Sequence, residues 1–302
     1  AEASGAEVKR ACYQGDVGLH VAKTLWAIKK DGGKMPDEEI SLSEKVSFLG
    51  QKYTEGNRAY EDDENSKKEI QKINSSIFKK DDGELMKIYE TGKNWSLQAF
   101  EKEYKRLGTK FDKYYFESQV FELGLQIVTE FLKKGVFEES DGAIIFRGEK
   151  YGSHTRVFVT SEGLPTYEAK EIGLNRQKFV DYPDLEKSLI ITGGEQKEYF
   201  RVLLSAMKEV YPDIARKTEH MAHGVLTLSS GKMSSREGNV IGVESFLNEV
   251  ESILNIGIIE SVLLETKIGT SSGTYRRSCN SISSVNEFGQ SALITTFLLF
   301  RS

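Results

Sequence analysis

The chain has 302 residues, with 41 Lys and Arg against 46 Asp and Glu for a net charge of −5, and 38% of its residues are hydrophobic. This composition supplies a substantial core and excludes collagen-like, disulfide-framework and wholly disordered proteins. No apolar run approaches the roughly 18 residues of a membrane helix, and the first nine residues lack the pattern of a signal peptide. Two cysteines, Cys12 and Cys279, make neither a framework nor a metal-type pair, which is typical of a cytoplasmic, reducing compartment.

The first third of the chain predicts a strand–turn–helix unit followed by a helical insertion. A short helix end at 1–4 precedes a strand over 6–13, a glycine-bearing turn over 15–18 and a helix over 19–30 with an apolar face. From about 36 to 107 the chain is rich in charge and nearly free of strand signals. We expect this stretch to be a helical insertion, with its charge runs on solvated faces.

The middle of the chain repeats the alternation of strand, turn and helix. An amphipathic helix is predicted over 117–132, and strands over 142–146, 155–159 and 188–192, the last followed by Gly193-Gly194 and another helix. This order indicates an α/β domain with a largely parallel sheet. Ligands of such sheets bind beyond the carboxyl ends of the strands.

The tail over 256–302 differs in composition from the rest. It has 7 charged residues in 47, against 80 in the preceding 255, and 14 of its residues are Ser or Thr. Its apolar run over 291–300 lacks helical periodicity and receives no assignment.

The segment Gly231–Asn239 is the most specific local feature. Glycines near both ends make a loop, Lys232 and Arg236 supply two cations, and Ser234 and Ser235 supply hydroxyl and backbone donors. Such a loop suits a polyphosphate, whose charge grows as pyrophosphate departs. The alternative is a solvated surface turn, and composition alone does not decide between them.

Tyr167 and Glu171 form a second candidate site. Pro165 fits the start of a helix, and the i, i+4 spacing puts a phenol and a carboxylate on one face. A carboxylate beside a ring can hold a guanidinium through paired charge-assisted hydrogen bonds. The alternative, an ordinary helix face with a solvated Glu171, is modestly favoured by spacing alone.

Two weaker motifs follow. Gln196 opens a helix after Gly193-Gly194, where its amide can contact a ligand carboxylate or ammonium; otherwise it is only a first-turn residue. His220 and His223 have an H-x-x-H spacing, but no further ligand lies close in the sequence, so zinc is disfavoured. A pocket edge against an aromatic base, with Gly224 allowing close approach, is weighed equally with plain structure. No G-x-S-x-G elbow, Walker A string or Cys–His pair occurs, so the chemistry is predicted to rest on positioning and charge stabilisation.

Taken together and in order, six strings resemble a class I aminoacyl-tRNA synthetase, and specifically the arginyl-tRNA synthetase family. The resemblance runs from Val8 to Asn255, and six strings in the right order are far more specific than any one of them. The strings are YQGDVGLHVAK (Tyr13–Lys23), YTEGNRAYEDDE (Tyr53–Glu64), RLGTKFDKYYFES (Arg106–Ser118), SEGLPTYEAKEIGL (Ser161–Leu174), ITGGEQKEYF (Ile191–Phe200) and HGVLTLSSGKMSSREGNVI (His223–Ile241).

The resemblance implies a Rossmann-like, parallel-sheet nucleotide-binding domain and an arginine–tRNA ligase activity. In that reaction L-arginine attacks ATP to give arginyl-adenylate and pyrophosphate, and tRNA(Arg) then accepts the arginyl group. Mg²⁺ accompanies ATP as part of the substrate complex, with no tightly bound cofactor, and family members generally need tRNA for activation. The parent protein is expected to be a cytoplasmic monomer without a membrane association.

The resemblance also implies roles for individual residues. Lys232, with Met233, Ser234, Ser235 and Arg236, lies in the loop that holds the β- and γ-phosphates; this Lys-Met-Ser-Ser-Arg replaces the usual Lys-Met-Ser-Lys-Ser, and Arg236 restores the missing charge. Tyr167, Glu171 and Gln196 match the positions that contact the arginine substrate. His223 and Gly224 match the stretch that borders adenine. The family often has Asp in place of Glu171, and Asn in place of Cys12.

Two departures limit the resemblance. The family's His-x-Gly-His signature, its central first strand and its N-terminal tRNA-contacting domain would lie upstream of Ala1. The strings of the helical anticodon-binding region are not found in 256–302, where that region is expected to start. We therefore predict a partial catalytic domain over 1–255, truncated at its first strand, with the insertion at about 36–107 and an unassigned tail. Such a chain should be weak or inactive alone, because half of a site that co-positions two phosphate clamps is missing.

Two alternatives remain from the sequence. One is another class I ligase, for cysteine or glutamine, that shares the Lys232 loop; Glu171 argues against it, because a carboxylate facing the substrate fits a cation. The other is a non-catalytic, synthetase-derived RNA-binding module. The encoding DNA upstream of Ala1 would separate these, since an in-frame His-x-Gly-His segment indicates an enzyme.

Overall fold

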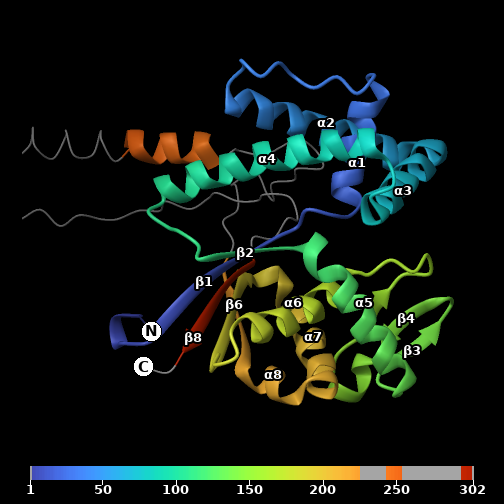
Figure 1. Ribbon diagram of the computed structural model, residues 1–302, viewed down its shortest axis with the longest axis vertical. Coiled ribbons are helices and arrows are strands. Elements are labelled where there is room, and N and C mark those ends of the chain that lie inside the picture. The colour runs from blue at the N-terminus through green and yellow to red at the C-terminus, as the bar shows by residue number, and fades with distance from the viewer. Residues whose placement is uncertain (1, 225–242, 254–293, 301–302) are drawn as a thin grey trace, which may run out of the picture. The chain divides into compact units, whose positions relative to one another are not determined.

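A computed structural model describes residues 2–224, 243–253 and 294–300 (Figure 1). The chain divides into two units, Ala1–Gly224 with Gln290–Ser302, and Val225–Gly289. The described part of the second unit is a helix over 243–253.

A five-stranded sheet in the order β2-β1-β8-β6-β7 organises the first unit. It consists of β1 (Glu7–Gln14), β2 (Lys113–Phe116), β6 (Lys187–Gly193), β7 (Thr218–His223) and β8 (Ile294–Phe300). The pairs β1–β2 and β6–β7 are parallel, as predicted for a largely parallel sheet. The central strand β8 is antiparallel to both β1 and β6. The four other strands therefore run in one direction and end at one edge.

The apolar run that received no assignment from the sequence contains this central strand. Its sequence, ITTFLLF, is a short apolar run, and periodicity alone does not separate such a run in a strand from one in a buried helix.

Helices pack on the sheet to form the main hydrophobic core. Tyr13 on β1 and Ile190 on β6 belong to this core together with buried residues of the helices that follow α5 along the chain. A small antiparallel sheet in the order β3-β4-β5 packs beside them. The elements are α5 (Glu117–Lys133), β3 (Glu138–Ser140), β4 (Ala143–Phe146), β5 (Arg156–Val159), α6 (Tyr167–Asp181), α7 (Lys197–Val210), α8 (Pro212–Lys217) and the 3₁₀ turns η1 (Glu2–Ser4), η2 (Gly148–Tyr151) and η3 (Gly194–Gln196).

The helices α5 and α6 lie unusually close together because each carries a glycine at the contact. A Cβ on Gly124 would overlap the carbonyl of Ala169, and a Cβ on Gly173 would overlap the carbonyl of Val120. Such a backbone-to-backbone contact leaves the two helices little freedom to move separately. The helices α5 and α6 therefore form one packed pair.

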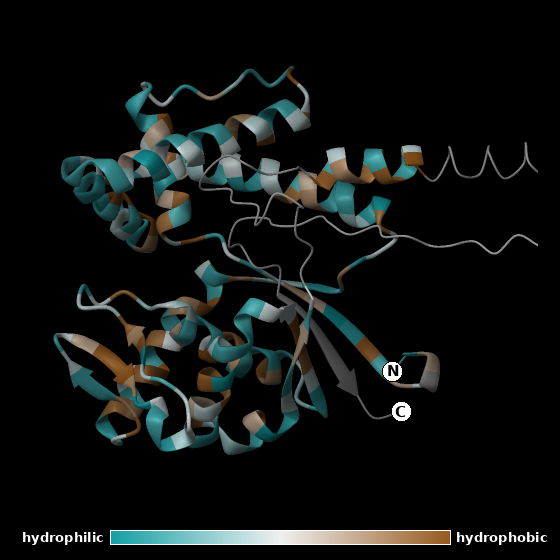
Figure 2. Ribbon diagram, turned by 180° about the vertical axis from the view of Figure 1, so that it is seen from behind, coloured by the Kyte–Doolittle hydropathy of each residue, from teal (hydrophilic) through white to brown (hydrophobic). Residues whose placement is uncertain are grey.

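Within its described residues, the predicted insertion contains helices and no strand, and it shares a hydrophobic core with α1 (Leu19–Lys30). It comprises α2 (Leu42–Asp62), α3 (Glu64–Lys79) and α4 (Gly83–Arg106), and Figure 1 shows these helices grouped with α1. Buried residues of α1, α3 and α4 form a second hydrophobic cluster. Hydrophilic and hydrophobic bands alternate along the helices, as amphipathic packing requires (Figure 2).

Capping residues explain where the insertion helices begin. The Ser41 side chain accepts a hydrogen bond from the backbone N–H of Glu44, and the Glu44 carboxylate accepts one from the backbone N–H of Ser41, which completes a capping box. Asp63 and Asp82 accept from Ser66 and Leu85 in the same way at the starts of α3 and α4. These side chains satisfy N–H groups that have no partner inside a helix. The limits of 36 and 107 for an inserted domain stay a prediction.

Candidate active site

Glu171 and Tyr167 lie on α6, which starts after Thr166 and packs against the sheet. Tyr167 is the first residue of the helix and is 46% exposed, whereas Glu171, one turn later, is 1% exposed. The ammonium of Lys170 lies 4.4 Å from the centroid of the Tyr167 ring. The phenol therefore stands at the surface end of the turn and the carboxylate at its buried end.

The Glu171 carboxylate is buried with few compensating partners. Its Oε1 accepts a 3.3 Å hydrogen bond from the Asn175 amide, and no described residue forms an ion pair with it within 4.0 Å. Burial raises the pKa of Glu171, opposed by the positive charge of Lys178 and reinforced by the negative charge of Glu117. The Lys178 ammonium is itself fully buried, donates to Ser188 Oγ at 3.1 Å, and has its pKa lowered by burial. A second cation close to Glu171 would therefore stabilise its ionised form.

Two further acceptors in this region have no hydrogen-bond partner among the described residues. They are the hydroxyl of Tyr13, near the carboxyl end of β1, and Oδ1 of Asn175, one turn along α6 from Glu171. Burial raises the pKa of the Tyr13 phenol, and the charges of Glu117 and Glu171 raise it further. A buried polar group without a partner costs free energy, so a ligand with several N–H donors would be favoured here.

The remaining described candidates lie at the carboxyl ends of β6 and β7. The register pairs Gly193 with His223, and a Cβ on Gly194 would lie 3.2 Å from the carbonyl oxygen of His223. Gln196 ends η3, precedes α7 and is partly exposed. His223 is exposed, and its Nδ1 lies 2.7 Å from the Gly224 carbonyl oxygen. These residues therefore share one edge of the sheet.

The H-x-x-H spacing falls on β7 and does not make a metal pair. Residues three apart on a strand point to opposite faces. His220 stacks on Phe200 with ring centroids 4.1 Å apart and lies 2.8 Å from Thr192 Oγ1, while His223 is exposed. Within the described residues no group of three His, Cys, Asp or Glu side chains could hold a metal ion.

The candidate phosphate loop lies outside the described residues. This applies to Lys232, Met233, Ser234, Ser235 and Arg236, and to the tail over 254–293. Of the part of the chain that is described, no helix is long and apolar enough to cross a membrane.

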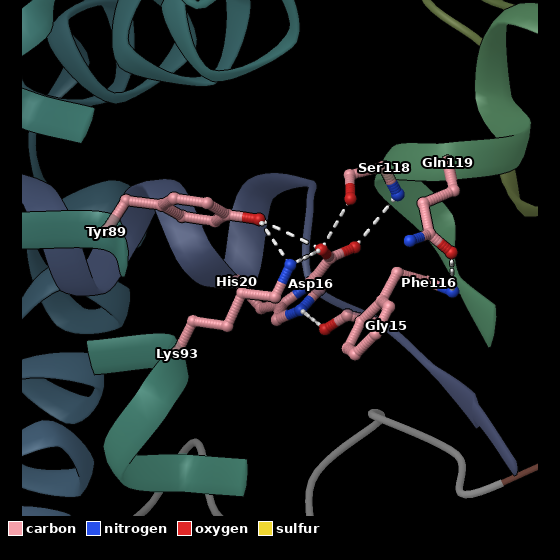
Figure 3. A network of polar contacts seen from close by, with 8 residues as sticks. All are labelled: Gly15, Asp16, His20, Tyr89, Lys93, Phe116, Ser118 and Gln119. Carbon is pink, nitrogen blue, oxygen red and sulfur yellow. Dashed lines mark hydrogen bonds and ion pairs between the residues drawn. The ribbon is translucent and has the colours of Figure 1, made fainter. Parts of the chain in front are cut away.

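A polar network that was not predicted from the sequence is centred on Asp16, in the turn after β1 (Figure 3). Its carboxylate accepts four hydrogen bonds: from Ser118 N at 2.9 Å, Ser118 Oγ at 2.6 Å, Tyr89 Oη at 2.9 Å and Lys93 Nζ at 2.6 Å. Burial alone would raise the pKa of Asp16, but the bonds from Lys93 and Ser118 outweigh it and lower that pKa. In the sequence Asp16 lies between Gly15 and Gly18 in the turn after a strand, and no local pattern there marks its partners.

A buried ion pair lies next to this network. Glu117, the first residue of α5, contacts Lys170 of α6 at 2.5 Å, and both side chains are 4% exposed. Burial raises the pKa of Glu117 to about 7, although the Lys170 charge opposes the shift. His20 lies 3.1 Å from the carbonyl oxygen of Gly15, and burial lowers its pKa. The start of α5 is thus tied both to the turn after β1 and to α6.

The family follows from comparison with known proteins. A model described as "tRNA synthetases class I (R), catalytic domain" matches residues 1–260. The fold and this match define a class I aminoacyl-tRNA synthetase catalytic domain, and the chain belongs to that (R) family. The fold is shared with the crystal structure of arginyl-tRNA synthetase from Plasmodium falciparum, with a TM-score of 0.60 at 16% identity over 85% of this chain and 41% of that one.

Curated relatives carry the name arginine–tRNA ligase. The protein of Borreliella afzelii is 30% identical over 262 residues, covering 84% of this chain and 44% of the relative. That of Flavobacterium psychrophilum is 30% identical over 288 residues, covering 88% and 48%. The chain therefore spans just under half the length of these relatives.

Proposed function

We propose that this chain is the catalytic part of an arginine–tRNA ligase, which activates L-arginine with ATP and transfers it to tRNA(Arg). The observation that carries the proposal is the buried carboxylate of Glu171, which has one amide donor and no ion pair within 4.0 Å among the described residues. Family membership and the names of the relatives support the same reaction. In this proposal the enzyme is a cytoplasmic monomer, and Mg²⁺ accompanies ATP.

The chemistry of the guanidinium fits the acceptors around Glu171. A guanidinium has five N–H donors, stays protonated at any physiological pH and binds a carboxylate through two parallel hydrogen bonds. Glu171 supplies a carboxylate, and the Tyr13 hydroxyl and Asn175 Oδ1 supply acceptors without partners among the described residues. Lysine, with a compact ammonium, or citrulline, without a charge, would satisfy fewer of these groups.

The reaction itself needs positioning more than acid–base catalysis. An oxygen of the arginine carboxylate attacks the α-phosphorus of ATP, the bond to the β-phosphate oxygen breaks, and pyrophosphate leaves. A hydroxyl of the terminal tRNA adenosine then attacks the arginyl carbonyl carbon, loses its proton, and AMP leaves. We assign the pyrophosphate charge to Lys232 and Arg236, contact with the amino-acid backbone to Gln196, and the adenine edge to His223-Gly224.

Ligand binding tests the proposal without requiring turnover. The wild-type chain and Glu171→Gln are titrated with arginine, lysine and citrulline by isothermal titration calorimetry. We expect the wild type to prefer arginine over both analogues, and Glu171→Gln to bind arginine at least 100-fold more weakly. Glu168→Gln is the matched control, because Glu168 is also buried on α6 but already pairs with Arg156 at 3.0 Å. The control should keep the preference for arginine.

Two outcomes would overturn the proposal. One is a wild type that binds arginine no better than citrulline. The other is a Glu171→Gln variant that binds arginine as tightly as the wild type does.

A further inference from the structure

The insertion helix α4 contacts Asp16 through two side chains on one of its faces. Tyr89 and Lys93 are one turn apart, and both bond to the same oxygen of Asp16, at 2.9 and 2.6 Å. The Lys93 ammonium also lies 4.2 Å from the centroid of the Phe116 ring, just before α5. Among the described residues Lys93 is the one cation paired with Asp16. The insertion therefore supplies the charge that keeps this buried carboxylate ionised.

Asp16 also contacts the first turn of α5. Its Oδ1 accepts from the backbone N–H of Ser118, a group that has no partner within the helix. Phe116 occupies the N-cap position and supplies no such side-chain bond, so Asp16, from another element, takes the role of the cap. A second contact between insertion and α5 is the edge-to-face pair of Phe78 and Phe121, with centroids 5.0 Å apart.

From α5 the connection reaches the residue beside Glu171. Glu117, adjacent to Ser118, pairs with Lys170, adjacent to Glu171. Along the rest of their length the two helices meet at Gly124 and Gly173, where backbone touches backbone. A shift at the start of α5 therefore displaces α6 as well, because packed glycine contacts leave no space to absorb it.

We propose that Lys93, Tyr89 and Asp16 are positioning residues for the arginine site, through which the helical insertion holds α5 and α6 in the geometry that presents Glu171. This inference rests on the proposed function for the identity of the ligand. The competing explanation is that the network only fixes the insertion to the sheet. That explanation predicts a loss of stability with no change at α6.

Lys93→Met tests the proposal, since it keeps the length of the side chain and removes its charge. The full chain is titrated with arginine, and backbone amide exchange is followed in 167–175 by mass spectrometry. We expect about tenfold weaker arginine binding and faster exchange in that segment. Lys93→Arg should restore binding to within threefold of wild type. The matched control, Lys87→Met, lies on an exposed part of α4 and should leave both readouts unchanged.

The outcomes separate the two explanations. Faster exchange confined to α4, with wild-type arginine affinity, would overturn the inference. If the wild type itself fails to select arginine, the proposed function fails, yet amide exchange in α6 still decides the coupling. Should Lys93→Met not fold, Tyr89→Phe removes one hydrogen bond and keeps the ring, with an expected threefold weakening. Unchanged binding and exchange in Tyr89→Phe would then overturn the inference.

Discussion

Asp16, in the turn after β1, and Glu171, on α6, are both buried carboxylates, but their surroundings differ. Asp16 accepts four hydrogen bonds, one of them from a lysine, and its pKa is lowered. Glu171 accepts one side-chain amide bond, and burial raises its pKa. A carboxylate with saturated acceptors holds the framework together, whereas one with spare acceptors in the same setting is suited to a ligand.

The largest expected effect comes from removing the saturated carboxylate. Asp16→Ala leaves Lys93, Tyr89 and the Ser118 N–H without their acceptor. Breaking a buried pair from one side should lower the free energy of unfolding by about 3 kcal/mol, measured by urea denaturation. Asp112→Ala is the control, since Asp112 is exposed and accepts one bond from the Arg10 N–H. An equal loss of unfolding free energy in the two variants would show that the Asp16 network contributes no more than an exposed contact does.

The contrast with Glu171 appears in the pH dependence of stability. An acid with a raised pKa in the folded state keeps its proton there while the unfolded chain ionises near pH 4.5, so stability falls as pH rises above that value. Each unit by which folding raises the pKa of Glu171 lowers the free energy of unfolding by about 1.4 kcal/mol once the pH is above the folded-state pKa. Relative to wild type, Glu171→Gln should therefore gain stability between pH 5 and pH 8. Lys178 adds to this gain. Without the Glu171 anion its folded-state pKa lies lower still, so in Glu171→Gln the neutral form that burial favours is reached at a lower pH.

Urea titrations of both proteins across this range measure the effect. A stability difference between Glu171→Gln and wild type that is constant with pH would mean that Glu171 titrates normally. The opposite trend belongs to Asp16, whose lowered pKa contributes stability that is lost only as the pH falls through its folded value, below 3.8.

Arginine binding should show the same titration at a smaller scale. Guanidinium pairs with the ionised carboxylate, so protonated Glu171 must release its proton on binding. We expect the dissociation constant to fall several-fold from pH 6 to pH 8, with proton release at pH 7. Calorimetry in buffers of different ionisation enthalpy measures that release. Binding without proton release, or affinity that weakens as the pH rises, would contradict an ionised Glu171 as the partner.

The difference between the two carboxylates also explains what the sequence could reveal. Local signals located the helix over 117–132, now α5, and the strand over 188–192, now within β6, because periodicity and glycine stops are properties of neighbouring residues. Glu171 was identified from its spacing to Tyr167 and from family resemblance, but its depth could not be. That depth is set by the contact of α6 with the sheet, which no local pattern records.

Asp16 could not be recognised from the sequence because its partners are far away along the chain. Tyr89 is 73 residues and Ser118 is 102 residues distant. The strand β8 was not predicted for a related reason, because its partners β1 and β6 are distant in sequence and flank it only in the folded sheet. Contacts of this kind decide which buried polar groups are satisfied.

The smallest expected effect distinguishes the Asp16 network from an ordinary contact of the insertion. Lys29 of α1 pairs with Asp82, the cap of α4, at 3.2 Å, but the Lys29 side chain is 57% exposed. Water and salt screen such a pair, and Asp82 keeps its bond to the Leu85 N–H when the lysine is lost. Lys29→Met should therefore leave the urea midpoint and the arginine affinity close to wild type, although it removes an ion pair to the same helix as Lys93→Met does. If the two variants weakened arginine binding equally, any loosening of α4 would be enough to weaken it. The contacts of Asp16 would then have no special role in positioning Glu171.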